Sequence, residues 1–237
     1  MYQSVLNKIK MKNLNKKFLI GISPNSKLLK EYKKSLVELN QIQFESAIGM
    51  MLGDSSLQSQ NKGKTYRLKF EWGEKNKPYL DHVYNLFDEW VLSKPHRKAR
   101  LSPKGNLVVN WGFQTISHKA FNPLAKLFLI NDKKGISDLL FFNNFTARSL
   151  AYWFMDDGGK LDYNKNSLNK SVVMNTQSFS EKEVEFLSSG LTKNYGLICE
   201  TRFNKGKKVI VIKSESYSLF RQLIDPYIIP EMLYKLP

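Results

Sequence analysis

The sequence predicts an α+β protein in which one domain plan occurs twice, and three observations support this prediction. Two short, nearly all-apolar stretches, at residues 44–54 and 149–159, indicate buried helices that each end near an aspartate. After each stretch, alternating runs that predict antiparallel β-hairpins are separated by amphipathic runs that predict helices. The order helix, hairpin, helix, hairpin, helix thus occurs twice with a period of roughly a hundred residues, which indicates a duplicated domain rather than a solenoid.

The two apolar stretches have the spacing of one helix face, because their apolar positions recur at intervals of three and four residues. These positions are Phe44, Ala47, Ile48, Met51 and Leu52 in the first stretch, and Leu150, Ala151, Phe154 and Met155 in the second. Little polar surface remains on either helix, so each is expected to pack against another element. The other copy is the obvious partner, and Gly49 is small enough to let a neighbouring backbone come close.

Each of these helices carries a carboxylate at its end, Asp54 in the first and Asp157 in the second. For one helix alone, the ordinary interpretation is a solvated helix end, although an anion there opposes the helix dipole. If the two helices pack side by side in the same direction, the two carboxylates meet, and like charges at close range are costly unless a cation lies between them. Oxygen ligands indicate a hard divalent ion and favour magnesium.

The first half begins with a predicted basic N-terminal tail, residues 1–25, which precedes the first repeat at residues 26–131. A helix is expected to begin near Lys27, after a run of capping residues. The elements predicted after Asp54 are hairpins over 55–72 and 96–111 and helices over 78–92 and 118–130, the last one interrupted or kinked by Pro123.

The second half consists of a linker at residues 132–145 and a second repeat at residues 146–237. Ser180 and Glu183 have the spacing of a capping box, which predicts a helix that begins there and ends near Tyr195. The other elements predicted after Asp157 are extended runs over 160–163 and 171–179, a hairpin over 198–213 and a helix over 215–225.

The charge balance is the most informative feature of the composition. Lysine and arginine number 37 against 21 aspartates and glutamates, a formal net charge of +16. Such an excess favours a polyanionic partner, usually nucleic acid, although it does not separate DNA from RNA. The single cysteine, Cys199, excludes an internal disulfide and a cysteine-based zinc site. No apolar run has the length of a membrane span, so no membrane partner is expected.

The predicted hairpins have the pattern of two-stranded ribbons that fit the major groove of DNA. Along residues 65–72 apolar and charged side chains alternate, so one face is apolar and the other is largely basic. Basic side chains can bind phosphates, and asparagine or glutamine can form paired hydrogen bonds with adenine. The candidate DNA-binding residues are Lys62, Lys64, Arg67, Lys69, His96, Arg97, Lys98, Arg100, Asn164, Lys165, Asn175, Gln177, Asn204, Lys205, Lys207 and Lys208.

The two apolar stretches resemble the nine-residue motif that names the LAGLIDADG homing endonucleases, and in particular the single-chain members with two repeats that yeast mitochondrial introns encode. The matching residues run from Ala47 to Ser55 and from Leu150 to Gly158. The resemblance covers the chain from near Pro24 to its end. Tyr152 departs from the motif, because the family has a small residue at this position that lets the two helices touch. The large side chain of Tyr152 therefore predicts an asymmetric packing of the two helices.

The resemblance implies a duplicated LAGLIDADG fold, in which two pseudo-symmetric αββαββα domains join their antiparallel sheets into a DNA-binding saddle. It implies that Asp54 and Asp157 are the catalytic acids, one for each DNA strand, and that the backbone carbonyls of Gly53 and Asp156 help them to bind metal. Magnesium is the expected cofactor, with manganese as a substitute.

The resemblance further implies that Lys134 and Lys235, one from each half, lie near the reacting phosphates and act in catalysis. The expected reaction is site-specific hydrolysis of both strands of a long, asymmetric DNA site, leaving short 3′ overhangs. The expected protein is a monomer without an obligate protein partner. Its expected location is the mitochondrion, and the organellar genome is the expected place of its gene.

Two alternatives remain open. The same fold can serve as an RNA maturase that assists splicing of its host intron, and the composition suits intron RNA equally well. A duplicated DNA-binding protein that does not cleave would need no metal. An acid at both Asp54 and Asp157 favours the nuclease, since a pure binder has no need of two anions that face a phosphate backbone. Asp156 remains an alternative second acid, because adjacent aspartates cannot be ranked by sequence.

Overall fold

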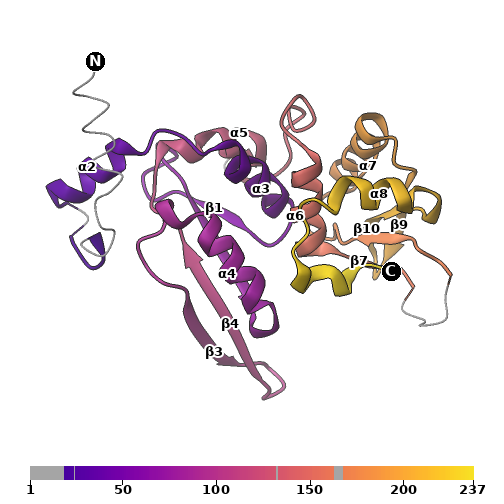
Figure 1. The fold of residues 1–237 in the computed structure, drawn as a ribbon, viewed down its shortest axis with the longest axis horizontal. Helices are drawn as coiled ribbons and strands as arrows, with labels where there is room; N and C mark the ends of the chain where they lie inside the picture. Colours follow the sequence, from indigo (N-terminus) through magenta and orange to yellow (C-terminus); the bar gives the residue numbers. More distant parts are fainter. Residues whose placement is uncertain (1–18, 24, 132, 163–167) are drawn as a thin grey trace. The chain divides into compact units, whose positions relative to one another are not determined.

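The computed structural model describes residues 19–23, 25–131, 133–162 and 168–237 (Figure 1). Most of the predicted tail, residues 1–25, and the candidate DNA-binding residues Asn164 and Lys165 lie outside these ranges. By their contacts, the described residues form two compact units. Unit 1 draws on Met1–Asn40 and Ser56–Pro123, and unit 2 draws on Gln41–Ser55 and Leu124–Pro237.

The described part of unit 1 is built on a four-stranded antiparallel sheet with the strand order β1-β2-β4-β3. Its strands are β1 (Ser56–Gln58), β2 (Arg67–Gly73), β3 (His96–Leu101) and β4 (Leu107–Gln114). Every second side chain of β2 is buried, and α4 (Lys77–Leu86) packs on β2 and β4. The Phe70 ring of β2 lies 4.8 Å from the ring of Phe113 in β4. The alternation read from the sequence therefore places the apolar face against α4.

Helix α2 (Lys27–Ser35) begins where the sequence predicts. The hydroxyl of Ser26 accepts a hydrogen bond of 3.1 Å from the backbone N–H of Leu29, which satisfies a donor in the first turn. The Tyr32 hydroxyl donates to the carbonyl of Glu89 at 2.5 Å, in the short helix η3 (Asp88–Trp90) that follows α4. This bond ties α2 to the rest of unit 1. Before α4, residues Glu74–Asn76 form the short helix η2.

The helix predicted over 118–130, interrupted or kinked by Pro123, is interrupted and ends before residue 129. The chain instead forms a short helix η4 (Lys119–Phe121), then α5 (Asn122–Phe128), and then strand β5 (Leu129–Ile130), which pairs with β6 (Lys133–Lys134). Pro123 lies in the first turn of α5, where its missing N–H has no partner to lose. Pro123 therefore lies at the start of an α-helix rather than at a kink, and the interruption is just before it, where η4 gives way to α5.

Unit 2 contains both motif helices and a second sheet. Helices α3 (Gln41–Leu52) and α6 (Ala147–Asp157) pack against each other. The described strands form an antiparallel sheet in the order β7-β8-β10-β9, from β7 (Gly158–Lys160), β8 (Val172–Met174), β9 (Cys199–Asn204) and β10 (Lys207–Ile212). Helix α7 (Glu181–Tyr195) packs on β9 and β10, and α8 (Tyr217–Ile224) packs on α6 (Figure 1).

The local signals in unit 2 agree with the structure. Ser180 and Glu183 form the predicted capping box of α7, and the left-handed Gly196 ends this helix. The helix predicted over 215–225 is present as the short helix η5 (Ser214–Ser216) followed by α8, whereas η6 (Pro230–Lys235) was not predicted. Helix η6 forms the C-terminal segment that carries Lys235.

The two sheets have equivalent strand orders, and the prediction of an α+β fold with antiparallel sheets is confirmed. The compact units are defined by contacts, and α3 is grouped with unit 2 because it packs on α6. The repeat boundaries 26–131 and 146–237 and the joining of the sheets into a saddle stay predictions. Among the described residues, every helix is too short or too polar to cross a membrane.

Candidate active site

The two motif helices approach each other closely at Gly49 of α3. A Cβ atom at this position would lie 2.7 Å from the Cβ of Tyr152 and 2.9 Å from the backbone nitrogen of Trp153. Such contacts are too short for carbon, so this approach of the backbones requires glycine on α3. Tyr152 is buried against it. The asymmetric packing predicted from Tyr152 is therefore present, with a small residue on one helix facing a large one on the other.

The same close approach occurs at the helix ends that carry the acids. A Cβ atom on Gly53 would lie 2.5 Å from Oδ2 of Asp156. The backbone N–H of Asp54 donates to that oxygen at 3.1 Å. The side chain of Asp156 thus closes the end of α3, and its Oδ1 is buried without a hydrogen-bond partner among the described residues. This engagement favours Asp157, rather than Asp156, as the second acid of the pair.

Asp54 and Asp157 lie close enough for the charge of one to act on the other. Burial and then the charge of Asp54 raise the pKa of Asp157 to about 7, and the charges of Lys235 and Lys134 oppose this change. Burial and the Asp54 charge also raise the pKa of Asp156 well above its usual range. A cation beside these groups would reverse both changes, since it favours the charged form of a carboxyl group.

Lys134 lies in β6, at the end of α3. Its ammonium donates to the carbonyl of Gly53 at 3.3 Å and lies 5.4 Å from the centre of the Phe179 ring. Desolvation lowers the pKa of Lys134, whereas the charges of the three aspartates raise it. The structure thus brings this lysine, which the family resemblance alone had indicated, to the acidic cluster.

Lys235 occupies the corresponding place at the end of α6. Its ammonium donates to the carbonyls of Met155 and Asp156, each at 2.6 Å. The last carbonyls of a helix lack partners within the helix, so a cation there satisfies them and offsets the negative end of the dipole. One lysine therefore lies at the end of each motif helix.

Asn175 makes contacts with Asp157 that the sequence did not indicate. Its backbone N–H and its side-chain amide both donate to the carbonyl of Asp157, each at 2.9 Å. Gln177 donates in turn to Oδ1 of Asn175 at 3.2 Å. These bonds hold the last residue of α6 to the end of β8. They follow from the pairing of β7 with β8, and the sequence alone does not reveal this pairing. The DNA contacts predicted for Asn175 and Gln177 stay predictions.

The donor set fits a hard divalent cation that is shared with a substrate. In the described ranges no group of three or more histidine, cysteine or acidic side chains is arranged to hold a metal by itself. Magnesium, however, is usually bound by one or two carboxylates, while waters and substrate phosphates complete its shell. Asp54 and Asp157 can supply those carboxylates. The predicted carbonyl ligands, on Gly53 and Asp156, already accept hydrogen bonds from the two lysines.

On the sheet of unit 1, the register gathers most of the predicted basic residues on the face opposite α4. Lys69 pairs with Gln114, and Lys98 pairs with Asn110. This polar face, which we call face 1, holds Arg67, Lys69, His96, Lys98, Arg100, Asn110 and Gln114, together with Glu71, which pairs with Lys98 at 2.6 Å. Arg97 belongs to the other face and forms an ion pair with Glu74 at 3.8 Å. Lys62 and Lys64 lie between β1 and β2.

On the sheet of unit 2, a hollow of about 310 Å³ is lined by polar and apolar side chains. The polar side chains that line it, which we call face 2, are Lys160, Asn175, Arg202 and Asn204. Asn204 pairs with the predicted Lys207, and Lys205 lies in the turn between them. Arg202 and Lys160 were missed by sequence reasoning. Arg202 could have been predicted from Asn204, because every second side chain of a strand lies on the same face.

Lys208 is placed differently from its predicted DNA-binding neighbours. Its ammonium forms ion pairs with Glu185 at 2.9 Å and with Glu181 at 3.1 Å, both in α7. Lys208 pairs in register with Phe203, which lies between Arg202 and Asn204 and points to the opposite face of the sheet. It therefore lies toward α7, and its placement gives no support to a DNA contact.

Comparison with known proteins identifies relatives of this chain. The sequence profile described as the LAGLIDADG DNA endonuclease family matches residues 44–220, which include both motif helices. The chain is 49% identical over 228 residues to a probable intron-encoded endonuclease 1 from Wickerhamomyces canadensis, across 96% of this chain and 98% of that relative. It is similar in structure to the homing endonuclease I-WcaI bound to its DNA recognition sequence, with a TM-score of 0.90 and 48% identity over 94% of this chain and 98% of that one.

A more distant relative carries a different description. The cytochrome b mRNA maturase bI2 of Saccharomyces cerevisiae is 29% identical over 240 residues, which cover 95% of this chain and 54% of the maturase. The chain thus spans about half the length of that relative.

Proposed function

The chain belongs to the LAGLIDADG DNA endonuclease family, and from this membership we propose that it cleaves both strands of DNA at a long, asymmetric site. The family resemblance seen in the sequence is confirmed. The observation that carries the finer proposal is the pair Asp54 and Asp157 at the ends of two packed helices, with one lysine donating to the carbonyls of each helix end. Two equivalent acids suit a reaction that has to be carried out twice, once on each strand.

We assign one strand to each acid. Magnesium held by Asp54 and Asp157, with manganese as a substitute, would lower the pKa of a bound water and would stabilise charge on the leaving oxygen. The two carboxylates would hold the ion, while Asn175 donates to the backbone carbonyl of Asp157 and keeps that residue at the end of β8. Lys134 and Lys235 add positive charge beside the phosphates, where negative charge develops during hydrolysis. Short 3′ overhangs are the expected products.

We assign DNA binding to face 1 and face 2. Face 1 offers five basic side chains beside two amides, and Lys98 among them pairs with Glu71 on the same face. Face 2 offers Lys160 and Arg202 beside two asparagines, and Arg202 pairs with Glu200 of its own strand. Phosphates would position the duplex on the basic groups, and the amides can read base edges. The predicted turn residues Lys62, Lys64 and Lys205 and the strand residue Lys207 remain candidates for phosphate contacts. We leave Arg97 and Lys208 out of this surface, since each is paired with glutamate away from these faces.

We further propose that an organellar intron encodes the chain and that it acts as a monomer in the mitochondrion. The description of the Wickerhamomyces canadensis relative as intron-encoded supports this proposal. An RNA maturase is the second candidate function, and the similarity to a maturase at 29% identity supports it.

The test is cleavage of a plasmid that carries the DNA recognition sequence of the structurally similar endonuclease. The full chain is incubated with this plasmid in magnesium and, in parallel, in excess chelator. We expect one linear product in magnesium and none in chelator. Equal cutting with chelator would contradict the metal dependence. Binding of the plasmid without any cut, together with tight binding of the intron transcript, would support the maturase instead.

A further inference from the structure

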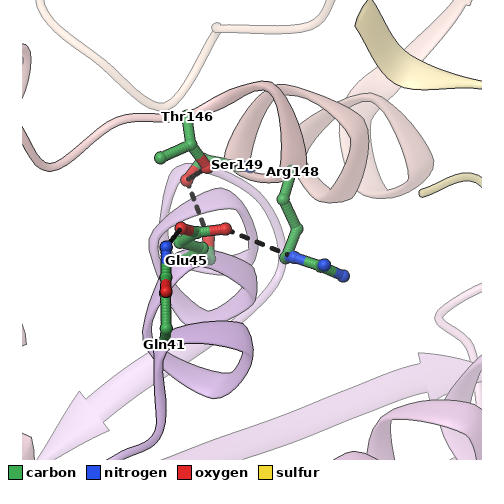
Figure 2. A network of polar contacts seen from close by, with 5 residues as sticks. All are labelled: Gln41, Glu45, Thr146, Arg148 and Ser149. Atoms are coloured by element: carbon green, nitrogen blue, oxygen red, sulfur yellow. Dashed lines mark hydrogen bonds and ion pairs between the residues drawn. The ribbon is translucent and has the colours of Figure 1, made fainter. Parts of the chain in front are cut away.

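A polar network lies at the ends of the motif helices that are distant from the acids (Figure 2). Both carboxylate oxygens of Glu45 in α3 are engaged there: Oε1 accepts from Gln41 at 2.9 Å, and Oε2 accepts from Nε of Arg148 at 3.3 Å. The hydroxyl of Ser149 donates to the backbone carbonyl of Glu45 at 2.8 Å. Arg148 and Ser149 belong to the first turn of α6, so the network joins the starts of the two helices.

The ion pair joins equivalent positions of the two repeats. Glu45 precedes Asp54 by nine residues, and Arg148 precedes Asp157 by nine residues. At the other end of the helix pair, Gly53 meets Asp156, and these two are again equivalent, each one residue before its acid. The helices are thus held in step at both ends. A helix rises 1.5 Å per residue, so Asp157 lies roughly 13.5 Å along α6 from Arg148.

Arg148 also contacts the chain that leads to Lys235. The centre of its guanidinium lies 4.4 Å from the centre of the Tyr227 ring. Tyr227 precedes η6, the short helix whose last residue, Lys235, donates to the end of α6. Arg148 therefore links three segments of unit 2, namely α6, α3 and the C-terminal segment. A planar guanidinium is suited to this, because it can pair with a carboxylate and stack on a ring at the same time.

We propose that Arg148 is a positioning residue for the DNA cleavage reaction, which sets the register of α3 against α6 and holds the segment that carries Lys235. This inference rests on the proposed endonuclease function. The side chains of Arg148 and Glu45 are 23% and 14% exposed, so water screens their pairing less than it screens a surface ion pair. Loss of the pair lets one helix slide or tilt relative to the other, and the two acids move with their helices.

A small displacement at the acids has a large effect on the rate. A misplacement of roughly 1 Å by a distant mutation can reduce a rate by about a hundredfold. Since Gly49 and the bond between Asp54 and Asp156 still hold the helices, we expect a smaller effect of about tenfold for loss of Arg148. The effect should fall on the rate of cutting, because Arg148 lies on neither face 1 nor face 2.

The experiment compares two variants of the full chain, Arg148→Met and Lys77→Met. Lys77 is the control, because it also pairs with an acid and contacts an aromatic ring, but within unit 1: it lies 2.6 Å from Asp81 and 4.9 Å from the centre of the Trp111 ring. The measurements are the cleavage rate at saturating DNA and magnesium, the Kd for DNA, and the melting temperature. We expect Arg148→Met to cut about ten times more slowly than Lys77→Met, with a Kd for DNA within about twofold of wild type. Equal rates in the two variants would overturn the proposal.

A double-mutant cycle with Glu45→Gln separates positioning from a general loss of packing. If Arg148 acts through Glu45, the rate of the double variant is close to that of either single variant. Multiplicative losses in the double variant would overturn the assignment of the ion pair. As a readout apart from activity, manganese binding to the DNA complex is followed by electron paramagnetic resonance, and Arg148→Met should need at least about threefold more manganese for half saturation. An unchanged half-saturation point would count against a displacement of the acids.

The outcomes also distinguish this inference from the proposed function. If the wild-type chain cuts no DNA in magnesium, the proposed function fails, whatever Arg148 does. If wild type cuts and Arg148→Met cuts equally well, only the positioning role fails.

Discussion

At Asp157 three conditions disfavour a negative charge at once. The residue ends a helix, its carboxyl group is shielded from water, and the charge of Asp54 acts on it. A protein gains no stability from this arrangement. Groups whose pKa is strongly displaced by burial together with a specific charged neighbour are characteristic of functional sites. Desolvation lowers the pKa of Lys134 beside Asp157, and the charges of the aspartates oppose that change.

The first prediction concerns stability without metal. The pKa of Asp157 is raised to about 7 in the folded chain, against 3.8 for the ordinary group. Between these values the folded state binds the extra proton, so stability falls as the pH rises, and the loss is complete above pH 7. In chelator at pH 8, Asp157→Asn should therefore melt at least about 3 °C above wild type. Calorimetry should show this difference vanish near pH 4.

The control for this prediction is Asp138→Asn, which changes an exposed aspartate of the same unit and should leave the melting temperature unchanged. An Asp157→Asn variant that melts with wild type at pH 8 would show that the carboxyl group is not held in an unfavourable charged state.

The second prediction separates the two lysines. Each donates to the end of a different motif helix, so each should serve one scissile phosphate. Lys134→Met and Lys235→Met should slow opposite strands by roughly a hundredfold, because each removes a charge that stabilises one reacting group. The measurement is single-turnover cleavage of a duplex with a different label on each strand. Lys126→Met, an exposed lysine of α5, is the control. Equal slowing of both strands by one variant would contradict separate half-sites.

At the scale of elements, the packing of α3 on α6 depends on one glycine. Gly49→Ala places a Cβ atom within 2.7 Å of the Cβ of Tyr152, and neither backbone can move without disturbing the helix ends. We predict a loss of unfolding free energy of about 1–3 kcal/mol, measured by denaturant unfolding. Gly73→Ala is the matched control, because a Cβ atom there meets nothing within 4 Å. Equal stability of the two variants would contradict the close helix contact.

Sequence patterns predicted the elements that have a strong period or a clear boundary. Helix α7 was found through its capping box, and the hairpins were found through alternation. Elements without such signals were missed. Strands β5 and β6 have two residues each, too few to show a period, and η6 is a short helix after a proline.

The candidate site was predictable only where it lay within a motif. Asp54 and Asp157 each end an apolar run, so the local sequence pattern is enough to identify them. Lys134 and Lys235 carry no such signal, since each acts on a helix that is distant in sequence, and only the family resemblance indicated them. The bond from Asn175 to Asp157 and the pairing of Arg148 with Glu45 are tertiary contacts that no local pattern encodes.

At the scale of the whole molecule, the net charge of +16 is the property that governs binding to a polyanion. Each phosphate contact releases a counterion from DNA, so the logarithm of the binding constant should fall linearly as the logarithm of salt concentration rises. We predict that Arg100→Gln, on face 1, reduces the slope by about 1. Titrations of a labelled duplex at several salt concentrations measure it, with Lys126→Gln as the control. An unchanged slope would remove Arg100 from the phosphate-binding surface.

The central claim is that Asp54 and Asp157 together cut double-stranded DNA. Its most direct test is plasmid cleavage in magnesium by wild type, Asp54→Asn and Asp157→Asn, with the Kd for the same site measured in calcium. The account predicts that wild type gives a linear product, that neither variant does, and that all three bind DNA with similar Kd. A linear product formed by either variant at the wild-type rate would contradict the assignment of the active site.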